Sequence, residues 1–352
     1  MKLILRCFAF AHAHALMLAF ALALAATTLG AQARDNVTLW VTLGDSDQLV
    51  EVDPYTYREL RRITVDPKPH GLAISADGSK VYLASDKTGN FQVVDVRSGK
   101  ITAQIKVGND PNQMTLTKDG KFAYVPLRGD SKIAVVQLDP LRLVKLLPSP
   151  AGPHDAYTSE DGKRIFVGAQ FGTGIVVIDP ATQSVLHVIP TTAGVRPIRP
   201  APDGKTLYVA LSNLLGFSVV DIETGRETRR VTLGTKPEGI PQPYRDTWTH
   251  DLQLVNDGKE LWLCDDLNDL IRVVRLADMK EIAQIRTGHF PHWFAMRPDG
   301  KVLFASLWFS DAVAALDVNT KKVITNIQFE LGGGPKRIAI GKRIESAGLR
   351  RQ

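Results

Sequence analysis

The chain has 352 residues, 23% of them charged, and its 43 Lys and Arg against 37 Asp and Glu give a formal charge of +6. This mild surplus is spread along the sequence, which argues against the clustered basic stripe that tracks nucleic-acid phosphates. With 2 cysteines the chain has no disulfide framework, so a packed core must stabilise its fold.

The first 33 residues have the pattern of an export signal. Lys2 and Arg6 supply a positive start, residues 8–28 are apolar and rich in alanine, and Ala31-Gln32-Ala33 is a small-x-small cleavage site. We therefore expect a signal peptide at residues 1–33 and a mature protein in the periplasm or outside the cell, without stable membrane insertion. Left uncleaved, the same stretch would serve as a membrane anchor.

From about residue 35 the chain repeats every 42 residues. Asp-Gly pairs mark the interval, with a single 54-residue step, at Asp77-Gly78, Asp119-Gly120, Asp161-Gly162, Asp203-Gly204, Asp257-Gly258 and Asp299-Gly300. Counting one interval back and one forward reaches Asp35 and Gly341, so the sequence predicts seven units. A period of about 40–45 residues with strand-like content is typical of propeller arrays.

Two further columns fix the register of the units. Five residues after each anchor stands an aromatic, which we expect to fill the space between neighbouring blades: Trp40, Tyr82, Tyr124, Phe166, Tyr208, Trp262 and Phe304. Eighteen residues after the anchor, most units have an Asp that we expect to open a turn by accepting hydrogen bonds from backbone amides: Asp53, Asp95, Asp179, Asp221 and Asp317.

Each unit reads as four antiparallel strands, which the second unit places at residues 71–74, 80–84, 91–96 and 101–107. The first unit offers strands only at 37–43, 49–52 and 60–65, and a segment at 337–340 supplies its inner strand. The sequence thus predicts an all-β, seven-bladed β-propeller at residues 34–341, closed by pairing the two ends of the chain, with a C-terminal tail at 342–352.

Several of these strand segments resemble the YVTN-repeat family of seven-bladed propellers, the YncE-like periplasmic and cell-surface proteins. The resemblance is carried by segments such as Arg164-Ile165-Phe166-Val167, Gly174-Ile175-Val176-Val177-Ile178-Asp179 and Pro237-Glu238-Gly239-Ile240. It covers about residues 36–341 and implies the fold and export. It leaves the activity open, because related propellers include sugar lactonases, streptogramin lyases, d1-haem proteins and copper enzymes.

One column gathers histidines at the start of the innermost strand, seven residues before each anchor. It reads His70, Asn112, His154, Arg196, His250, His292 and Gly334. Because the connections into the inner strands open on one face of the disc, we expect these side chains to encircle the mouth of the central channel.

Three interpretations of this column remain open. The histidines hydrogen-bond the backbone of neighbouring blades. Alternatively, His70, His154, His250 and His292 bind copper, zinc or iron, with Asp155 and Asp251 orienting the rings. In the third interpretation Arg196 supplies fixed charge to an acid-base or anion-binding pocket in which a histidine transfers protons.

Other segments are expected on the same face. The loops between the second and third strands carry Asp86, Lys87, Arg128, Gln170, Asp265, Asp266 and Trp308. The excess of 12 residues over the regular step falls at residues 235–249, and we expect a partial lid there, with Arg245 and Trp248 touching the ligand. Cys264 is expected to be a buried core thiol.

The sequence therefore predicts an exported propeller that binds a ligand or metal at the channel mouth, as a binding or scaffold protein. Asn112, Arg196, Arg128, Asp266, Arg245, Trp248 and Trp308 are the candidate ligand-binding residues. The alternative is a metal-dependent or acid-base enzyme working at the four histidines, an oxidoreductase or a lactonase or lyase. A second alternative is nucleic-acid binding, which the resemblance to the YVTN-repeat family implies. The expected partners are a small molecule, a metal or an envelope protein, and the charge distribution argues against nucleic acid.

Overall fold

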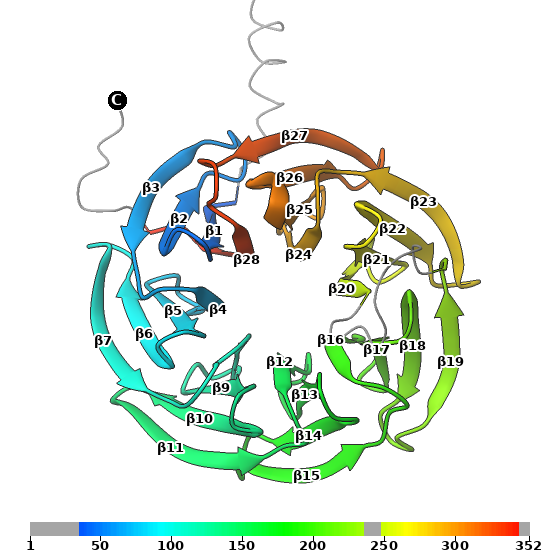
Figure 1. Cartoon of the computed structure of the whole chain (residues 1–352), viewed down its shortest axis with the longest axis horizontal. Coiled ribbons are helices and arrows are strands. Elements are labelled where there is room, and N and C mark those ends of the chain that lie inside the picture. Colours follow the sequence, from blue (N-terminus) through cyan, green and yellow to red (C-terminus); the bar gives the residue numbers. More distant parts are fainter. Residues whose placement is uncertain (1–34, 236–247, 345–352) are drawn as a thin grey trace, which may run out of the picture. The chain divides into compact units, whose positions relative to one another are not determined.

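The computed structural model describes residues 35–235 and 248–344 of a chain that divides into two units, Met1–Asn36 and Val37–Gln352. The expected signal peptide at residues 1–33 and most of the expected tail lie outside the described residues. The second unit is a ring of seven four-stranded antiparallel sheets, its blades, so the predicted seven-bladed propeller is confirmed (Figure 1). In the described part of the chain, no helix has the length and apolar character needed to cross a membrane.

The blades are numbered in chain order, and the strands of each blade run from the innermost outward. Blade 1 contains β28 (Pro335–Lys342), β1 (Val37–Leu43), β2 (Gln48–Val52) and β3 (Glu59–Thr64). Blade 2 contains β4 (Pro69–Ile74), β5 (Lys80–Ser85), β6 (Asn90–Asp95) and β7 (Lys100–Lys106). Blade 3 contains β8 (Thr115–Leu116), β9 (Phe122–Leu127), β10 (Lys132–Leu138) and β11 (Leu141–Pro148).

The remaining four blades follow the same order. Blade 4 contains β12 (Pro153–Thr158), β13 (Ile165–Ala169), β14 (Ile175–Asp179) and β15 (Ser184–Ile189). Blade 5 contains β16 (Val195–Pro200), β17 (Thr206–Leu211), β18 (Gly216–Asp221) and β19 (Glu227–Thr232). Blade 6 contains β20 (Thr249–Val255), β21 (Glu260–Asp265), β22 (Leu270–Arg275) and β23 (Lys280–Arg286). Blade 7 contains β24 (Pro291–Met296), β25 (Val302–Leu307), β26 (Ala312–Asp317) and β27 (Lys322–Gln328), and a 3-10 turn, η1 (Trp308–Ser310), follows β25.

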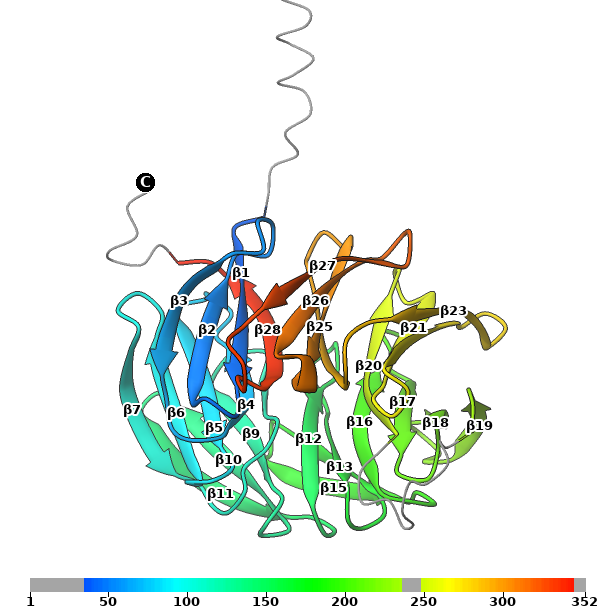
Figure 2. The same ribbon diagram turned by 45° about the horizontal axis from the view of Figure 1, so that its top comes forward.

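The two ends of the propeller unit close the ring as the sequence predicts. Strand β28 pairs antiparallel with β1, from Val37 opposite Lys342 to Leu43 opposite Pro335. Figures 1 and 2 show β28 beside β1 in the first blade. This pairing satisfies backbone groups that an open sheet edge would leave exposed.

The core consists of seven apolar clusters, one at each interface between neighbouring blades. Each cluster contains one member of the aromatic column, and all seven aromatics are at most 9% exposed: Trp40, Tyr82, Tyr124, Phe166, Tyr208, Trp262 and Phe304. The expectation that these rings fill the space between blades is confirmed. Because every blade buries both faces in this way, the inner strands are held at fixed positions around one axis.

The two predicted turn signals are confirmed as well. The glycine of each Asp-Gly pair has a positive φ, for example 79° at Gly78, which favours glycine at that position. The Asp column opens the turn between the third and fourth strands, as at Asp95, whose Oδ1 accepts a hydrogen bond from the Ser98 amide. Cys264 is fully buried in the core, also as expected.

Candidate functional site

The histidine column lies where each innermost strand begins and its pairing to the second strand is interrupted. The register shifts at this point in β4, β12, β16, β20, β24 and β28. Such a bulge takes residues out of the ladder and re-aims their side chains. We call the seven side chains at this position the polar ring: His70, Asn112, His154, Arg196, His250, His292 and Lys336. All are buried, with at most 8% of their surface exposed.

The seventh member of the ring is Lys336, not the Gly334 that counting by 42 residues had placed there. The connection from β23 to β24 has four residues, 287–290, whereas the connection from β27 to β28 has six, 329–334. The column is therefore displaced by two residues in the last unit. A prolyl residue precedes the ring position in five blades, including Pro335, and this signal in the sequence would have given the right register.

The four histidines form two pairs in the ring. The imidazoles of His250 and His292 are stacked, with centroids 3.4 Å apart and an interplanar angle of 28°. Those of His70 and His154 meet edge to face at 5.5 Å. The sequence prediction that the four lie at one end of the inner strands is consistent with these contacts.

His250 contacts one cation and one carboxyl group. Its Nδ1 lies 3.3 Å from Nη1 of Arg196 and 3.3 Å from Oδ2 of Asp266. Asp266 comes from the loop after β21, so two expected site residues and one histidine are brought together. Burial raises the pKa of the Asp266 carboxyl well above its ordinary value. The group can therefore hold a proton that an ordinary aspartate would have lost.

A second cation, Arg337, stands next to Lys336, and no pattern in the sequence had singled it out. Its Nη2 donates a hydrogen bond to Oδ1 of the fully buried Asp155, and Oδ1 lies 3.0 Å from Nδ1 of His154. The guanidinium carbon of Arg337 is 3.0 Å from the centroid of the Trp293 ring, and that of Arg196 is 5.9 Å from it. Asp155 thus contacts its histidine as expected.

Asp251 does not play the expected part. Its carboxylate accepts hydrogen bonds from the amides of Leu252 and Phe294 and lies 3.3 Å from Nη2 of Arg199. These contacts join blade 6 to its neighbours, so Asp251 is a structural residue of the inner strands.

Buried polar atoms without a hydrogen-bond partner gather at the ring. Among the described residues they include Nε2 of all four histidines, Nδ2 of Asn112 and Nε1 of Trp293. Each such atom costs about 1–3 kcal/mol when it is buried. Because native proteins keep few of them, the cluster indicates a place where a bound molecule supplies the missing partners.

The electrostatics of the ring favour neutral imidazoles and negative ligands. Burial lowers the pKa of His70, His154, His250 and His292 well below 6.5, and the charges that add most to this effect are cationic, chiefly Arg196, Lys336 and Arg337. Burial also lowers the pKa of Lys336 to about 8 and that of Arg196 to about 9. At neutral pH both remain charged, so the ring has a positive potential at its histidines.

The loops on this face place the other expected residues differently. Trp308 adjoins the polar ring, because the centroid of its indole lies 5.0 Å from that of the His292 imidazole. Its Nε1 donates a hydrogen bond to Oδ2 of Asp45. Arg128 makes a bidentate ion pair with Asp110 and is therefore already neutralised. Trp248 is half-buried just before β20, while Arg245 and most of the expected lid lie outside the described residues.

The described residues do not form a ligand set for the metal site that the sequence suggested. Within residues 35–235 and 248–344, no three His, Cys, Asp or Glu side chains are grouped so that they could hold a metal ion. The stacked pair His250 and His292 presents ring faces to each other, whereas metal coordination uses nitrogen lone pairs in the plane of the ring.

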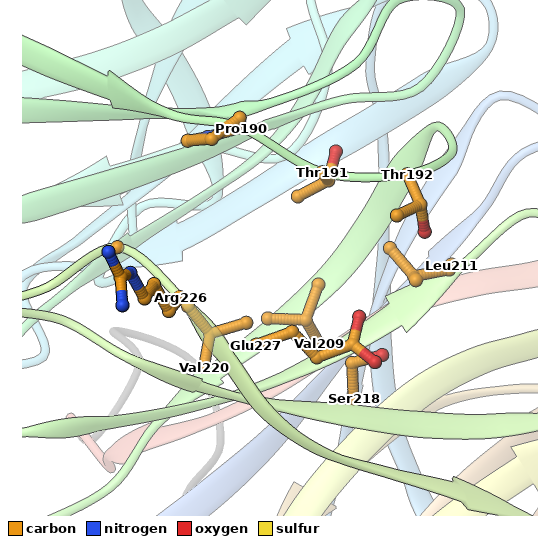
Figure 3. Close-up of a pocket in the computed structure, with 10 residues that line it drawn as sticks. Pro190, Thr191, Thr192, Val209, Leu211, Ser218, Val220, Arg226 and Glu227 are labelled. Carbon is orange, nitrogen blue, oxygen red and sulfur yellow. The ribbon is translucent and has the colours of Figure 1, made fainter.

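A cleft of about 420 Å³ lies away from the ring, between blades 4 and 5 (Figure 3). Val209, Leu211 and Val220 form an apolar wall. Glu227 is bonded to Arg230, and Thr191 accepts from the Gly174 amide and donates to Ala193. Ser218 also lines the cleft, with a buried Oγ that has no partner among the described residues. Because Glu227 and Thr191 are already bonded, the cleft offers less for recognition than the polar ring does.

The fold and the ring together define a seven-bladed propeller with a buried polar cluster at one end of its inner strands. A family model described as YNCE-like beta-propeller matches residues 74–251, and a second, described as Lactonase, 7-bladed beta-propeller, matches residues 180–333. Since the first match spans half of the chain, the chain belongs to the YNCE-like beta-propeller family. The search of curated proteins found no match.

Solved structures with the same fold are distant in sequence. Kuenenia stuttgartiensis hydrazine synthase is 20% identical with a TM-score of 0.70, over 80% of this chain and 92% of that one. The periplasmic gluconolactonase PpgL of Pseudomonas aeruginosa is 19% identical with a TM-score of 0.69, over 87% and 99%. The dihydro-heme d1 dehydrogenase NirN, in complex with DHE, is 16% identical with a TM-score of 0.65, over 83% and 64%. At these identities the likeness extends to the fold alone.

Proposed function

We propose that this protein is an exported propeller that binds a small organic anion at the polar ring. The observation that carries the proposal is the set of buried cations, Arg196, Lys336 and Arg337, set among imidazoles whose Nε2 atoms have no partner in the described residues. A carboxylate or similar group would supply acceptors to these donors. Charged hydrogen bonds of this kind are stronger than neutral ones.

The carboxyl groups near the polar ring do not cancel its preference for an anionic ligand. Burial raises the pKa of Asp266 well above its ordinary value, so its negative form is disfavoured where it stands. Asp155 is already bonded to Arg337. Lys336, whose Nζ lies 3.7 Å from Oδ2 of Asp86, is therefore the cation on which the proposal places an incoming anion.

Export is part of the proposal. The first 33 residues have the pattern of a cleaved signal, and one solved protein with the same fold is named a periplasmic gluconolactonase. Both features favour a ligand that is met in the periplasm.

The test is a calorimetric titration of the secreted protein with benzoate, gluconate and inorganic phosphate. We expect saturable binding of at least one organic anion, weakened about tenfold or more in Lys336→Met, because a charged partner is lost. Lys342→Met is the matched control, since this exposed lysine lies at the far end of the same strand. Saturable binding by none of the probes, or equal weakening by both substitutions, would overturn the proposal.

A second candidate function is the hydrolysis of a sugar lactone. The lactonase model matches residues 180–333, a range that includes Arg196, His250 and Asp266. In this reaction neutral His250 would take a proton from water as its oxygen adds to the lactone carbonyl. The lactone C–O bond then breaks, and the leaving oxygen takes the proton from the imidazolium, directly or by way of Asp266, which restores neutral His250. The product is a hydroxy acid, which releases a proton to water and becomes a hydroxycarboxylate, the kind of anion that the polar ring favours.

Gluconolactone hydrolysis separates the two functions. An enzyme would show turnover that falls at least a hundredfold in His250→Ala while the folded state survives. Anion binding without turnover leaves the binding function alone.

The remaining sequence hypotheses have direct tests. Elemental analysis of the secreted protein would reveal stoichiometric copper, zinc or iron, and His250→Ala/His292→Ala should remove it if these residues are ligands. Nucleic-acid binding would weaken steeply as salt rises, and we expect no such slope because the basic residues are not clustered.

A further inference from the structure

An exposed aromatic cluster adjoins the polar ring. We call Phe290, Trp308 and Phe309 the aromatic platform. Trp308 and Phe309 are stacked at 5.5 Å with an interplanar angle of 25°, and Phe290 lies 4.9 Å from Phe309 and 6.0 Å from Trp308. Phe309 keeps 66% of its surface exposed. A large aromatic side chain held against two others while facing solvent is a surface ready for contact with a further ring.

The backbone holds the platform in place. Phe290 has a φ of 61°, which is rare for a bulky residue, and its amide donates to Oδ1 of Asp269. Asp311, which follows the turn that carries Trp308 and Phe309, has a φ of 48°, and its carboxylate accepts hydrogen bonds from the amides of Gly332 and Gly334. Positive φ values recur at the equivalent positions of other blades, for example at Lys68 and Asp269, so this backbone conformation belongs to the repeat and fixes where the aromatic side chains stand.

The platform is directly connected to the cations and imidazoles of the ring. Nζ of Lys336 lies 4.7 Å from the centroid of Trp308, and the His292 imidazole lies 5.3 Å from the ring of Phe290. Nζ of Lys336 lies 3.7 Å from Oδ2 of Asp86. A ligand carboxylate at hydrogen-bond distance would be closer to the ammonium group than Asp86 is. A ligand that touches the platform therefore has a positive group at its edge.

We propose that the ligand is an aromatic carboxylate whose planar ring stacks on the aromatic platform while its carboxylate faces Lys336. This inference rests on the proposed anion binding, and it specifies that the anionic group is attached to a planar aromatic ring. Phe171 provides a comparison within the fold, because it occupies the place in blade 4 that Phe309 occupies in blade 7. It is 56% exposed, yet in the described structure its partner is Arg128 and not a second aromatic ring.

The experiment compares benzoate with cyclohexanecarboxylate, which has a similar size and the same charge but no aromatic face. We expect wild-type protein to bind benzoate about threefold to tenfold more tightly, the range that one aromatic contact provides. Phe309→Ala should abolish this preference, and Phe171→Ala should leave it unchanged. Both positions are exposed, so the folded state should be retained, and thermal unfolding checks this.

The possible outcomes separate this inference from the proposed function. Equal affinity of the two acids in wild-type protein, with both weakened by Lys336→Met, overturns the platform and leaves anion binding in place. A loss of both affinities to the same extent in Phe309→Ala also overturns it, because the ring would then serve as a general apolar contact. No saturable binding of either acid overturns this inference, and the proposed function falls with it only if gluconate and inorganic phosphate also fail to bind.

Discussion

The guanidinium carbon of Arg337 lies 3.0 Å from the centroid of the Trp293 ring, and Nη2 of the same group donates to Oδ1 of Asp155. The carboxylate belongs to blade 4, whereas Trp293 belongs to blade 7 and Arg337 to blade 1. One buried cation therefore ties together three blades across the axis of the ring. Buried ion pairs of this kind depend on both partners, because a single unpaired charge is costly to bury.

Asp155→Asn tests this connection. With its carboxylate lost, Arg337 would remain buried without a counter-charge, and we expect a loss of about 3 kcal/mol or more in the free energy of unfolding, measured by urea denaturation. The surviving folded fraction should bind benzoate more tightly, because a competing carboxylate is gone. Glu160→Gln, at an exposed position after the same strand, is the control. A change below about 1 kcal/mol would show that Asp155 is neutral in the folded protein.

Lys336 makes anion binding depend on pH. Burial lowers its pKa to about 8, so the side chain is charged at neutral pH and becomes neutral as the pH rises through that value. The charged groups around it are Asp86, Asp45, Arg196 and Arg128. Arg196, with a pKa of about 9, loses its charge only at higher pH.

We therefore expect the affinity for benzoate to be full below about pH 7 and to fall as the pH rises from about 7 to about 9, as measured by calorimetry. Lys336→Met should have weak affinity with no such change in that interval. An affinity that falls equally in wild-type protein and Lys336→Met would assign the titration to another group.

The fold could be predicted because its determinants repeat. Seven aromatics at one position and glycines at a turn that demands positive φ are visible in the sequence, and each marks a local structure that forms in every unit. The polar ring was predicted only in part, because it depends on the lengths of the connections between blades and on the orientations of side chains, which do not repeat. Two extra residues before β28 hid Lys336, and the bulges that turn the side chains have no signal of their own.

Contacts across the axis were beyond prediction from the sequence. Nothing in the spacing of Asp155 and Arg337 indicates that they meet, since they lie 182 positions apart. The stacking of His250 on His292 is a similar case, because both residues share a column with two other histidines. Side-chain direction at a bulge decides which members of the column meet.

Ring closure gives a prediction about stability. A chain ending before Pro335 would lack β28 and leave β1 as an open inner edge, with the apolar cluster between blades 1 and 7 deprived of Ile338. We expect this truncation to abolish the cooperative thermal transition, because stability in such arrays depends on contacts between neighbouring units. A chain ending after Ile344 keeps β28 and is the control. If the protein that ends before Pro335 unfolded at the same temperature as the control, pairing of the two chain ends would not be needed to close the propeller.

The buried histidines give stability a defined dependence on pH. Their pKa values are well below 6.5 in the folded protein, so only the unfolded chain takes up these protons as the pH falls below that value. The contribution of the neutral imidazoles is therefore complete above about pH 6.5 and is lost in acid. His70→Asn, which copies the residue found in blade 3, removes one such group. We expect the slope of unfolding free energy against pH, between about pH 6 and 5, to decrease by about 1.4 kcal/mol per unit.

Urea denaturation at several pH values measures this slope, and its difference from wild type is the quantity to compare. The difference matters because burial raises the pKa values of Asp155 and Asp266, and these groups bind protons in the folded state and oppose the effect of the histidines. His187→Asn, on the exposed face of β15, should leave the slope as it is. An unchanged slope in His70→Asn would mean that the imidazole is protonated within the ring, and the positive potential inferred there would have to be abandoned.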